Sequence, residues 1–222
     1  MGIFETFSGV AAPLLRPNID TDAIIPSREM KLVSKVGLGE GLFASWRYTL
    51  PGGREANNNF VLNLPEYQHC SVILAGNNFG CGSSREHAVW ALAEYGIKCI
   101  VAPSFGSIFF NNCIANGLLP VELPEQEIER IAAWVEQNPQ QHRVTVNLEN
   151  QTLQWDQQQA QFDIDENAKK MLLQGLDPID LTLSMNSEID RFEQADRLAR
   201  PWIYLPKKVK EPKRNPETAG IS

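Results

Sequence analysis

The sequence has few of the features that mark metal, nucleic-acid and membrane proteins. Its four cysteines contain no Cys-x-x-Cys pair, so the spacing of a zinc site or a self-contained iron–sulfur site is missing. It has no apolar run long enough for a transmembrane helix and no secretion-signal pattern at its start. The net charge of −7 argues against nucleic acid as a main partner. We therefore expect a cytoplasmic protein with reduced thiols that binds no membrane, no nucleic acid and no metal of its own.

Length and composition predict one substantial globular domain. The 222 residues are 43% hydrophobic and 21% charged, which is ordinary for such a domain. Charge is uneven, because residues 206–222 carry a net charge of +3 and leave −10 on the rest of the chain. We expect a domain over 1–205 and a disordered basic tail over 206–222.

From Ser71 onward, strand-like and helix-like segments alternate, whereas residues 1–66 are rich in Gly, Pro and Asn and indicate loops and short strands. The predicted strands are 71–75, 97–102, 118–123 and a hairpin of 143–148 with 151–155. The predicted helices are about 84–95, 104–116, 124–137, 163–175 and 187–199. Strands that alternate with helices predict a single α/β domain with a mostly parallel sheet covered by helices.

The segment Asn78-Phe-Gly-Cys-Gly-Ser-Ser-Arg-Glu-His87 joins a predicted buried strand to a predicted helix. Gly80 and Gly82 allow tight turns and a close approach of the backbone to a ligand. Ser83 and Ser84 lie near the first turn of the helix, where unpaired N–H groups and the helix dipole favour an anion. Arg85 adds a planar fork suited to a carboxylate or phosphate. The segment therefore predicts an anion site.

Helix capping explains the first segment equally well. Ser83 and Glu86 have the Ser-x-x-Glu spacing of a capping box, and Arg85 could be an ordinary surface charge. A second unusual segment, Asn18-Ile-Asp-Thr-Asp-Ala-Ile-Ile-Pro26, places two aspartates before an apolar run. These carboxylates could position a basic side chain or a substrate group, but a turn capped by its own Asn and Asp side chains fits the pattern better.

Together, the two segments and their order resemble the swivelling domain of the aconitase superfamily. The chain is similar to the free-standing form of that domain, the small subunits of isopropylmalate isomerases. The resemblance covers the chain from Leu14 to about Leu198 and includes the segments 41–48, 102–105, 116–120 and 175–183. It implies an aconitase C-terminal-domain-like fold. It also implies a hydro-lyase of leucine biosynthesis that converts 2-isopropylmalate into 3-isopropylmalate by dehydration and rehydration.

The resemblance also implies roles for single residues. Ser83 matches the family's general base, and Ser84 and Arg85 match residues that hold the substrate, with Gly80 and Gly82 in the same loop. Asp22 matches an aspartate of the aconitase active-site cleft. Cys81 stands where aconitases commonly have an acidic residue, a departure that fits the small-subunit branch. The implied partner is a large subunit that carries a [4Fe–4S] cluster on its own cysteines, and this chain binds no cofactor itself.

Substrate choice is expected in the loop after the first strand. Its candidate contacts with an isopropyl group are Leu32, Val33, Leu38, Leu42 and Phe43. Apolar burial of one branch discriminates by only about 1–3 kcal/mol, so a homoaconitase-like or methylmalate-type dehydratase is an alternative. A hypothesis from another class is a non-catalytic module that uses the glycine-rich segment only to bind carboxylates.

Overall fold

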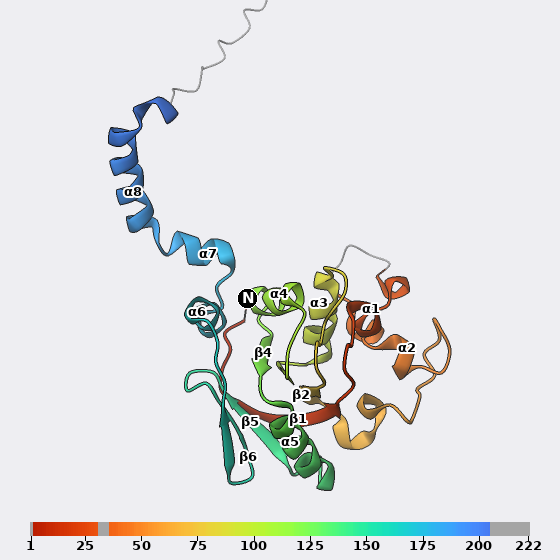
Figure 1. The fold of residues 1–222 in the computed structure, drawn as a ribbon. Coiled ribbons are helices and arrows are strands. Elements are labelled where there is room, and N and C mark those ends of the chain that lie inside the picture. The colour runs from red at the N-terminus through yellow and green to blue at the C-terminus, as the bar shows by residue number, and fades with distance from the viewer. Residues whose placement is uncertain (1, 31–35, 205–222) are drawn as a thin grey trace, which may run out of the picture. The chain divides into compact units, whose positions relative to one another are not determined.

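The computed structural model describes residues 2–30 and 36–204, and its contacts divide the chain into two compact units, Met1–Leu181 and Thr182–Ser222. The first unit contains a seven-stranded sheet in the order β4-β3-β2-β1-β5-β6-β7 (Figure 1). Its strands are β1 (Phe7–Leu14), β2 (Cys70–Ala75), β3 (Cys99–Ala102), β4 (Leu119–Glu122), β5 (Arg143–Asn147), β6 (Thr152–Trp155) and β7 (Gln158–Gln161). The predicted boundary between a domain and a basic tail at 205/206 lies outside the described residues.

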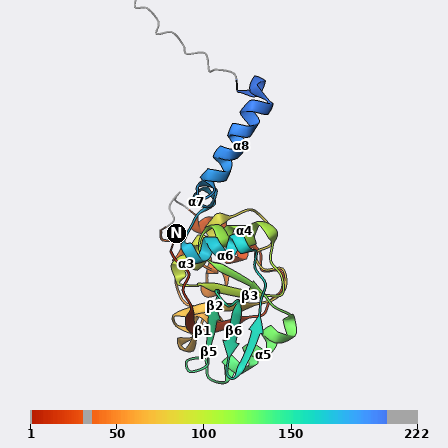
Figure 2. The same ribbon diagram turned by 90° about the vertical axis from the view of Figure 1, so that its left-hand side faces the viewer.

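The helices of this unit lie on both sides of the sheet. Figures 1 and 2 show α3 and α4 on one side and α5 on the other. The α-helices are α1 (Thr21–Ile24), α2 (Ala44–Arg47), α3 (Glu86–Tyr95), α4 (Ser107–Ala115), α5 (Glu125–Gln137), α6 (Glu166–Gln174) and α7 (Pro178–Leu183), which ends just past the unit boundary. Short 3-10 helices are η1 (Ser27–Glu29), η2 (Gly39–Gly41), η3 (Val61–Asn63) and η4 (Pro65–Tyr67).

The predicted α/β class is confirmed, but the sheet is mixed and only partly parallel. Strands β1 to β4 pair in parallel. By contrast, β1 with β5, β5 with β6, and β6 with β7 are antiparallel. The prediction of a mostly parallel sheet failed because the hairpin of β5 and β6, although expected, was not predicted to join the same sheet beside β1.

Burial explains why the strands and helices in the middle of the chain could be predicted from the sequence. Every residue of β3, and all of β2 except Ser71, is buried, as expected for parallel strands covered on both faces. In α5 the buried residues Ile128, Ile131, Ala132 and Val135 follow the helical period. Gly96 ends α3 with a positive φ of 109°, as the sequence predicted. The observed bounds of β2, β3, β4, α3 and α4 fall within three residues of the predicted ones.

The longest described strand, β1, was missed. Its sequence, Phe-Ser-Gly-Val-Ala-Ala-Pro-Leu, contains Gly9 and Pro13 and has few β-branched residues, so local propensity argues against a central strand. Pairing with both β2 and β5 overrides that propensity. Strand β7 was missed as well, because Gln158–Gln161 is almost entirely polar and lies at the edge of the sheet.

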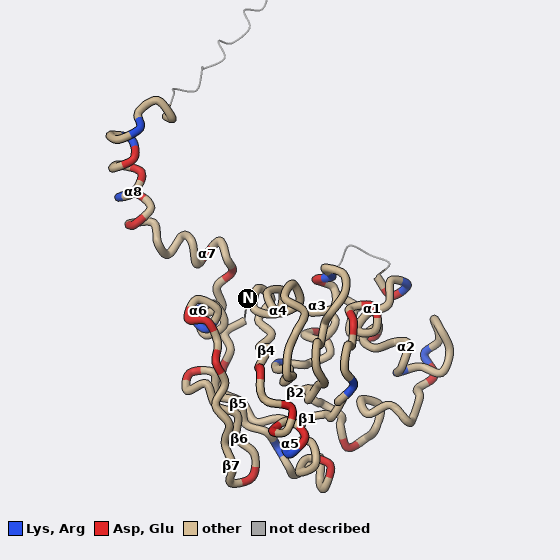
Figure 3. Tube along the Cα trace, viewed as in Figure 1, with Lys and Arg blue, Asp and Glu red and all other residues tan. Residues whose placement is uncertain are grey.

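The second unit contains α8 (Asn186–Ala199) and η5 (Pro201–Ile203), which agrees with the predicted helix at 187–199. Acidic and basic residues follow one another along α8 (Figure 3), and its ion pairs include Arg197 with Glu193 and Arg200 with Asp196. Across the described ranges, none of the helices has the length and apolar character needed to cross a membrane.

Candidate functional site

The two unusual sequence segments meet at one edge of the sheet. Residues 18–22 follow β1, and residues 78–85 follow β2. Strands β1 and β2 are parallel neighbours, with Leu14 opposite Ala75, so their carboxyl ends lie together. This edge is where open α/β sheets generally place ligands, because the loops that leave adjacent strands diverge there.

A series of hydrogen bonds fixes the two segments side by side. Asn18 and Asn78 both adopt left-handed backbone conformations, with φ of 56° and 59°, and the Asn78 side-chain amide donates to Asn18 Oδ1 at 2.8 Å. Thr21 donates its backbone N–H to the Cys81 carbonyl at 3.0 Å and its hydroxyl to the Ser83 carbonyl at 3.0 Å. The Gly80 N–H donates to the Ile19 carbonyl at 2.7 Å. The loop that carries Ser83 is therefore supported along its length.

Ser83 and Ser84 precede α3 rather than entering its first turn. Helix α3 begins at Glu86, and its N-cap is Arg85, which makes no side-chain capping bond. The capping box between Ser83 and Glu86 is therefore not formed, and both serines are exposed. The backbone N–H groups of Ser83, Ser84 and Arg85 donate to no described residue. These unpaired donors beside a helix N-terminus support an anion site better than a capping role.

Arg85 and Asp22 form an ion pair between the two segments. Nη1 of Arg85 donates to Asp22 Oδ1, which also accepts from the Ser27 hydroxyl at 3.2 Å. The hydrogen bond from Arg85 is the main cause that lowers the pKa of Asp22 below its ordinary value. The Arg85 side chain is only 20% exposed, yet its Nη2 and Nε donate to no described residue. Asp22 thus holds one side of a guanidinium whose other donors remain open to a carboxylate.

The two glycines of the loop are required for different reasons. At Gly80, φ is +71° and an added Cβ would lie 2.2 Å from Cγ of Phe109, so neither the conformation nor the space admits a side chain. At Gly82, φ is +92°, but the nearest atom to an added Cβ is 3.5 Å away. Backbone conformation alone therefore selects glycine at position 82.

Comparisons with known proteins agree with this geometry. The family model for the aconitase C-terminal domain matches residues 1–126, and a second model, LeuD_N, matches residues 129–166. The 3-isopropylmalate dehydratase small subunit of Cupriavidus necator is 56% identical over 91% of this chain and 98% of its own length. That of Roseobacter denitrificans is 46% identical over 91% of this chain and 100% of its own. The chain belongs to the family of 3-isopropylmalate dehydratase small subunits.

A solved structure supports the same assignment. The chain is similar to 3-isopropylmalate dehydratase from Methanocaldococcus jannaschii, with a TM-score of 0.60 and 26% identity, covering 85% of this chain and 99% of that one. The predicted aconitase-like fold and family are thereby confirmed. As a member of this family, the chain is the small subunit of a hydro-lyase of leucine biosynthesis. The name small subunit implies a large one as its partner.

The candidate specificity residues of this family member do not form a surface pocket in the described chain. Leu32 and Val33 lie outside the described residues. Leu38, Leu42 and Phe43 are buried in the core, with exposures of 4%, 0% and 0%. Their apolar side chains pack inward in this chain, as Phe43 does by stacking on Trp46 with ring centroids 5.6 Å apart, and their contact with a substrate stays a prediction.

A support for that loop was not anticipated from the sequence. The Glu94 carboxylate, near the end of α3, accepts from the N–H groups of Gly37 and Gly39, each at 2.7 Å. These bonds lower the pKa of Glu94, with the Gly37 N–H as the largest cause. Nothing local marked Glu94, because its partners are more than 50 residues away. Helix α3 therefore connects two sites: Arg85 is its N-cap, and Glu94 near its other end holds the loop after residue 36.

The cysteines of this family member are unsuited to holding a metal. Cys70, Cys99 and Cys113 are buried free thiols, and Cys81 is half-buried. Burial raises the pKa of Cys70 to about 12 and raises those of Cys99 and Cys113 as well, which favours the neutral thiol over the metal-binding thiolate. Within residues 2–30 and 36–204, no three His, Cys, Asp or Glu side chains are grouped to bind a metal ion.

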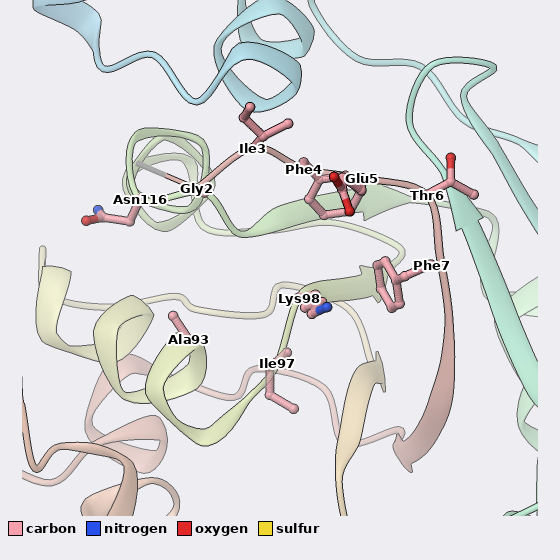
Figure 4. A pocket seen from close by; sticks show the side chains of 11 residues that line it. Gly2, Ile3, Phe4, Glu5, Thr6, Phe7, Ala93, Ile97, Lys98 and Asn116 are labelled. Carbon is pink, nitrogen blue, oxygen red and sulfur yellow. The ribbon is translucent and has the colours of Figure 1, made fainter.

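Three cavities lined by described residues lie away from the loop of residues 78–85, called the motif loop below. One, of about 290 Å³, lies between the N-terminal segment and the start of β3 (Figure 4). It is lined by residues 2–7, Ala93, Ile97, Lys98, Asn116 and Gly117. Nζ of Lys98 lies 5.2 Å from the Phe7 ring centroid in a cation–π contact, so this cation already has a partner.

Proposed function

We propose that this chain supplies the proton-transfer and carboxylate-binding half of the active site that isomerises 2-isopropylmalate to 3-isopropylmalate. Ser83, as its alkoxide, takes the proton from the carbon beside a substrate carboxylate, and hydroxide leaves the neighbouring carbon, so that the elements of one water are removed. Hydroxide then adds to the carbon that lost the proton, and Ser83 returns its proton to the carbon that lost the hydroxyl. The observation that carries this proposal is the juxtaposition of exposed Ser83, the Asp22–Arg85 ion pair and the unpaired N–H groups ahead of α3.

The electrostatics around Ser83 suit a serine that acts as a base. A serine hydroxyl is too weakly acidic to ionise in water at neutral pH, so its alkoxide needs hydrogen-bond donors and positive charge. Unpaired backbone N–H groups of the loop, the positive end of α3 and the Arg85 guanidinium supply both. Because Ser83 is exposed in this chain, exclusion of water requires a cover, which would strengthen each interaction.

Arg85 and Ser84 are proposed to hold a substrate carboxylate. With Nη1 of Arg85 bonded to Asp22, the remaining guanidinium donors can form a fork with a second carboxylate. Asp22 then acts by fixing Arg85 rather than by contacting a dicarboxylate of like charge. Gly80 and Gly82 contribute by shaping the loop, since both have a positive φ.

The cover is proposed to be the large subunit, and the [4Fe–4S] cluster of the enzyme is proposed to reside there. The residues of this chain do not fit as cluster ligands, because the buried cysteines favour neutral thiols and no metal-holding group exists in the described ranges. The chemistry assigned to this chain is therefore confined to proton transfer and carboxylate binding. Four free cysteines suit a reducing compartment, and we propose the cytoplasm.

The isopropyl group of the substrate is proposed to contact the loop that precedes η2. Leu32 and Val33 are candidates for direct contact, whereas Leu38, Leu42 and Phe43 support the loop from the core. Apolar contact of this kind contributes about 1–3 kcal/mol of discrimination.

Replacement of Ser83 by Ala tests the proposal. The variant is assembled anaerobically with the large subunit, and the unsaturated intermediate is followed by its absorbance. We expect turnover to fall by roughly 100-fold or more while assembly is preserved. Ser107→Ala, an exposed serine at the start of α4, is the matched control and should remain active. Retained turnover in Ser83→Ala would remove Ser83 from the role of base.

A further inference from the structure

Thr21 is an unusual polar residue of this fold. Its exposure is 2%, and within the described ranges Thr152 is the only other buried polar or charged residue. The Thr21 hydroxyl donates to the Ser83 carbonyl, at 3.0 Å, across 62 residues of sequence. Thr21 neither ionises nor faces solvent, so it belongs to neither the proposed base nor the proposed carboxylate clamp.

The hydroxyl is carried on a well-fixed support. Helix α1 is capped by the Asp20 carboxylate, which accepts from the Ala23 N–H at 2.7 Å. The Thr21 carbonyl accepts from the Ile25 N–H at 3.0 Å, and Ile24 and Ile25 are fully buried. A short helix with buried apolar residues on one side and a cap on the other leaves the Thr21 side chain little freedom.

Thr21 contacts the motif loop twice, on both sides of Gly82. Its N–H bonds the Cys81 carbonyl, and its hydroxyl bonds the Ser83 carbonyl. Without the hydroxyl, Cys81 would be the last supported residue before Ser83, and the next would be Arg85, which Asp22 holds. Gly82, with φ of +92°, would then separate Cys81 from Ser83. Glycine is the residue with the widest choice of backbone conformations, so Ser83 would no longer be held in one orientation.

The bond also sets the direction of the next amide. The peptide group is planar and trans, so its carbonyl and the following N–H point in opposite directions. A Ser83 carbonyl that points at Thr21 therefore turns the Ser84 N–H away from α1. That N–H donates to no described residue, so it is available to an anion.

We infer that Thr21 is a positioning residue, whose buried hydroxyl orients the Ser83–Ser84 peptide and thereby the Ser83 side chain and the Ser84 N–H. This inference rests on the proposed role of Ser83 as the base. A positioning residue acts on the reacting geometry, so its loss lowers kcat more than it raises KM.

The test compares Thr21→Val, which keeps the shape and removes the hydroxyl, with Thr21→Ser, which keeps the hydroxyl. Each chain is assembled with the large subunit, and kcat, KM and the melting temperature of the free chain are measured. We expect kcat of Thr21→Val to fall by roughly 100-fold with a much smaller change in KM, and Thr21→Ser to recover most of the loss. Thr152→Val, at the other buried threonine, is the matched control and should keep its kcat.

A second readout does not depend on turnover. In the free chain labelled with ¹³C at the serine carbonyls, the Ser83 resonance should shift in Thr21→Val and return in Thr21→Ser. If Thr21→Val does not fold, Thr21→Ala serves as the variant without a hydroxyl. Unchanged kcat in the hydroxyl-free variant, with Ser83→Ala inactive, would overturn the inference and leave the proposed function standing. Equal losses in Thr21→Val and Thr21→Ser would also overturn it, whereas an active Ser83→Ala would overturn the proposed function itself.

Discussion

The guanidinium of Arg85 donates to the carboxylate of Asp22, so the two segments singled out in the sequence are joined by an ion pair 63 residues apart in the chain. The sequence alone left each segment with an ordinary explanation, a helix cap for one and a capped turn for the other. Their contact favours an anion site over these explanations, because an arginine held on one side by a carboxylate presents its other donors in a fixed direction.

Asp22→Asn should lower kcat/KM and remove part of the acid dependence of stability. The pKa of Asp22 is lowered in the folded state, so its contribution to stability is present above the unfolded pKa and is lost as pH falls through the folded pKa. Since Asp22 is 56% exposed, the stability effect is small, about 0–1 kcal/mol. Urea unfolding of both proteins between neutral pH and pH 3 measures it, with Asp190→Asn on α8 as the control. A larger loss at acidic pH than at neutral pH on mutation would contradict this prediction.

Arg85→Lys should weaken substrate binding although it keeps the charge. Lysine cannot bond Asp22 and a substrate carboxylate with one planar group, so at least one charged hydrogen bond is lost. We expect kcat/KM to fall by roughly 10- to 100-fold, from a loss of about 1.5–3 kcal/mol. Steady-state kinetics of the assembled enzyme measure this, and Arg130→Lys on the exposed face of α5 is the control. Equal kinetics for wild type and Arg85→Lys would show that the planar guanidinium is not needed to bind the substrate carboxylate.

Gly80→Ala should destabilise the chain far more than Gly52→Ala. Both glycines have a positive φ, of 71° and 76°, but an added Cβ meets Phe109 at position 80 and nothing within 4 Å at position 52. Strain alone costs about 1–2 kcal/mol, and the clash adds about 1–3 kcal/mol. Urea unfolding of the two variants separates the backbone strain from the clash. Similar free energies of unfolding would show that Phe109 moves aside without destabilising the chain.

Glu94→Gln should loosen the loop that follows residue 36. A glutamine has one acceptor oxygen, so it cannot accept from Gly37 and Gly39 through separate oxygens as the carboxylate does. We expect a loss of about 1 kcal/mol in unfolding free energy and faster amide hydrogen exchange at both glycines. As with Asp22, the lowered pKa of Glu94 means that its contribution disappears as pH falls through the folded pKa. Hydrogen exchange as slow as in wild type would exclude this anchoring role.

Local sequence patterns predicted the strands in the middle of the chain but missed those that form only through pairing with distant strands. Continuous apolar runs identified β2, β3 and β4, because parallel strands covered on both faces need them. Strand β1, with Gly9 and Pro13, has no such run and owes its existence to two neighbours that are distant in sequence. At the candidate site, residue types predicted an anion site around Ser83 and Arg85, whereas Thr21 and Glu94 bond distant partners that no local pattern reveals.

The parallel pairing of β1 with β2 determines how easily the contacts of the candidate site are lost. Closing a loop of about 60 residues costs on the order of 4 kcal/mol in chain entropy, whereas an exposed ion pair returns about 0–1 kcal/mol. Asp22 and Arg85 would therefore not find each other in an unpaired chain; the sheet brings them together beforehand. Substitutions that weaken the pairing at the ends of β1 and β2 should thus abolish enzyme activity while most of the protein is still folded. Activity therefore reports the loss of this pairing more sensitively than any global measure of unfolding.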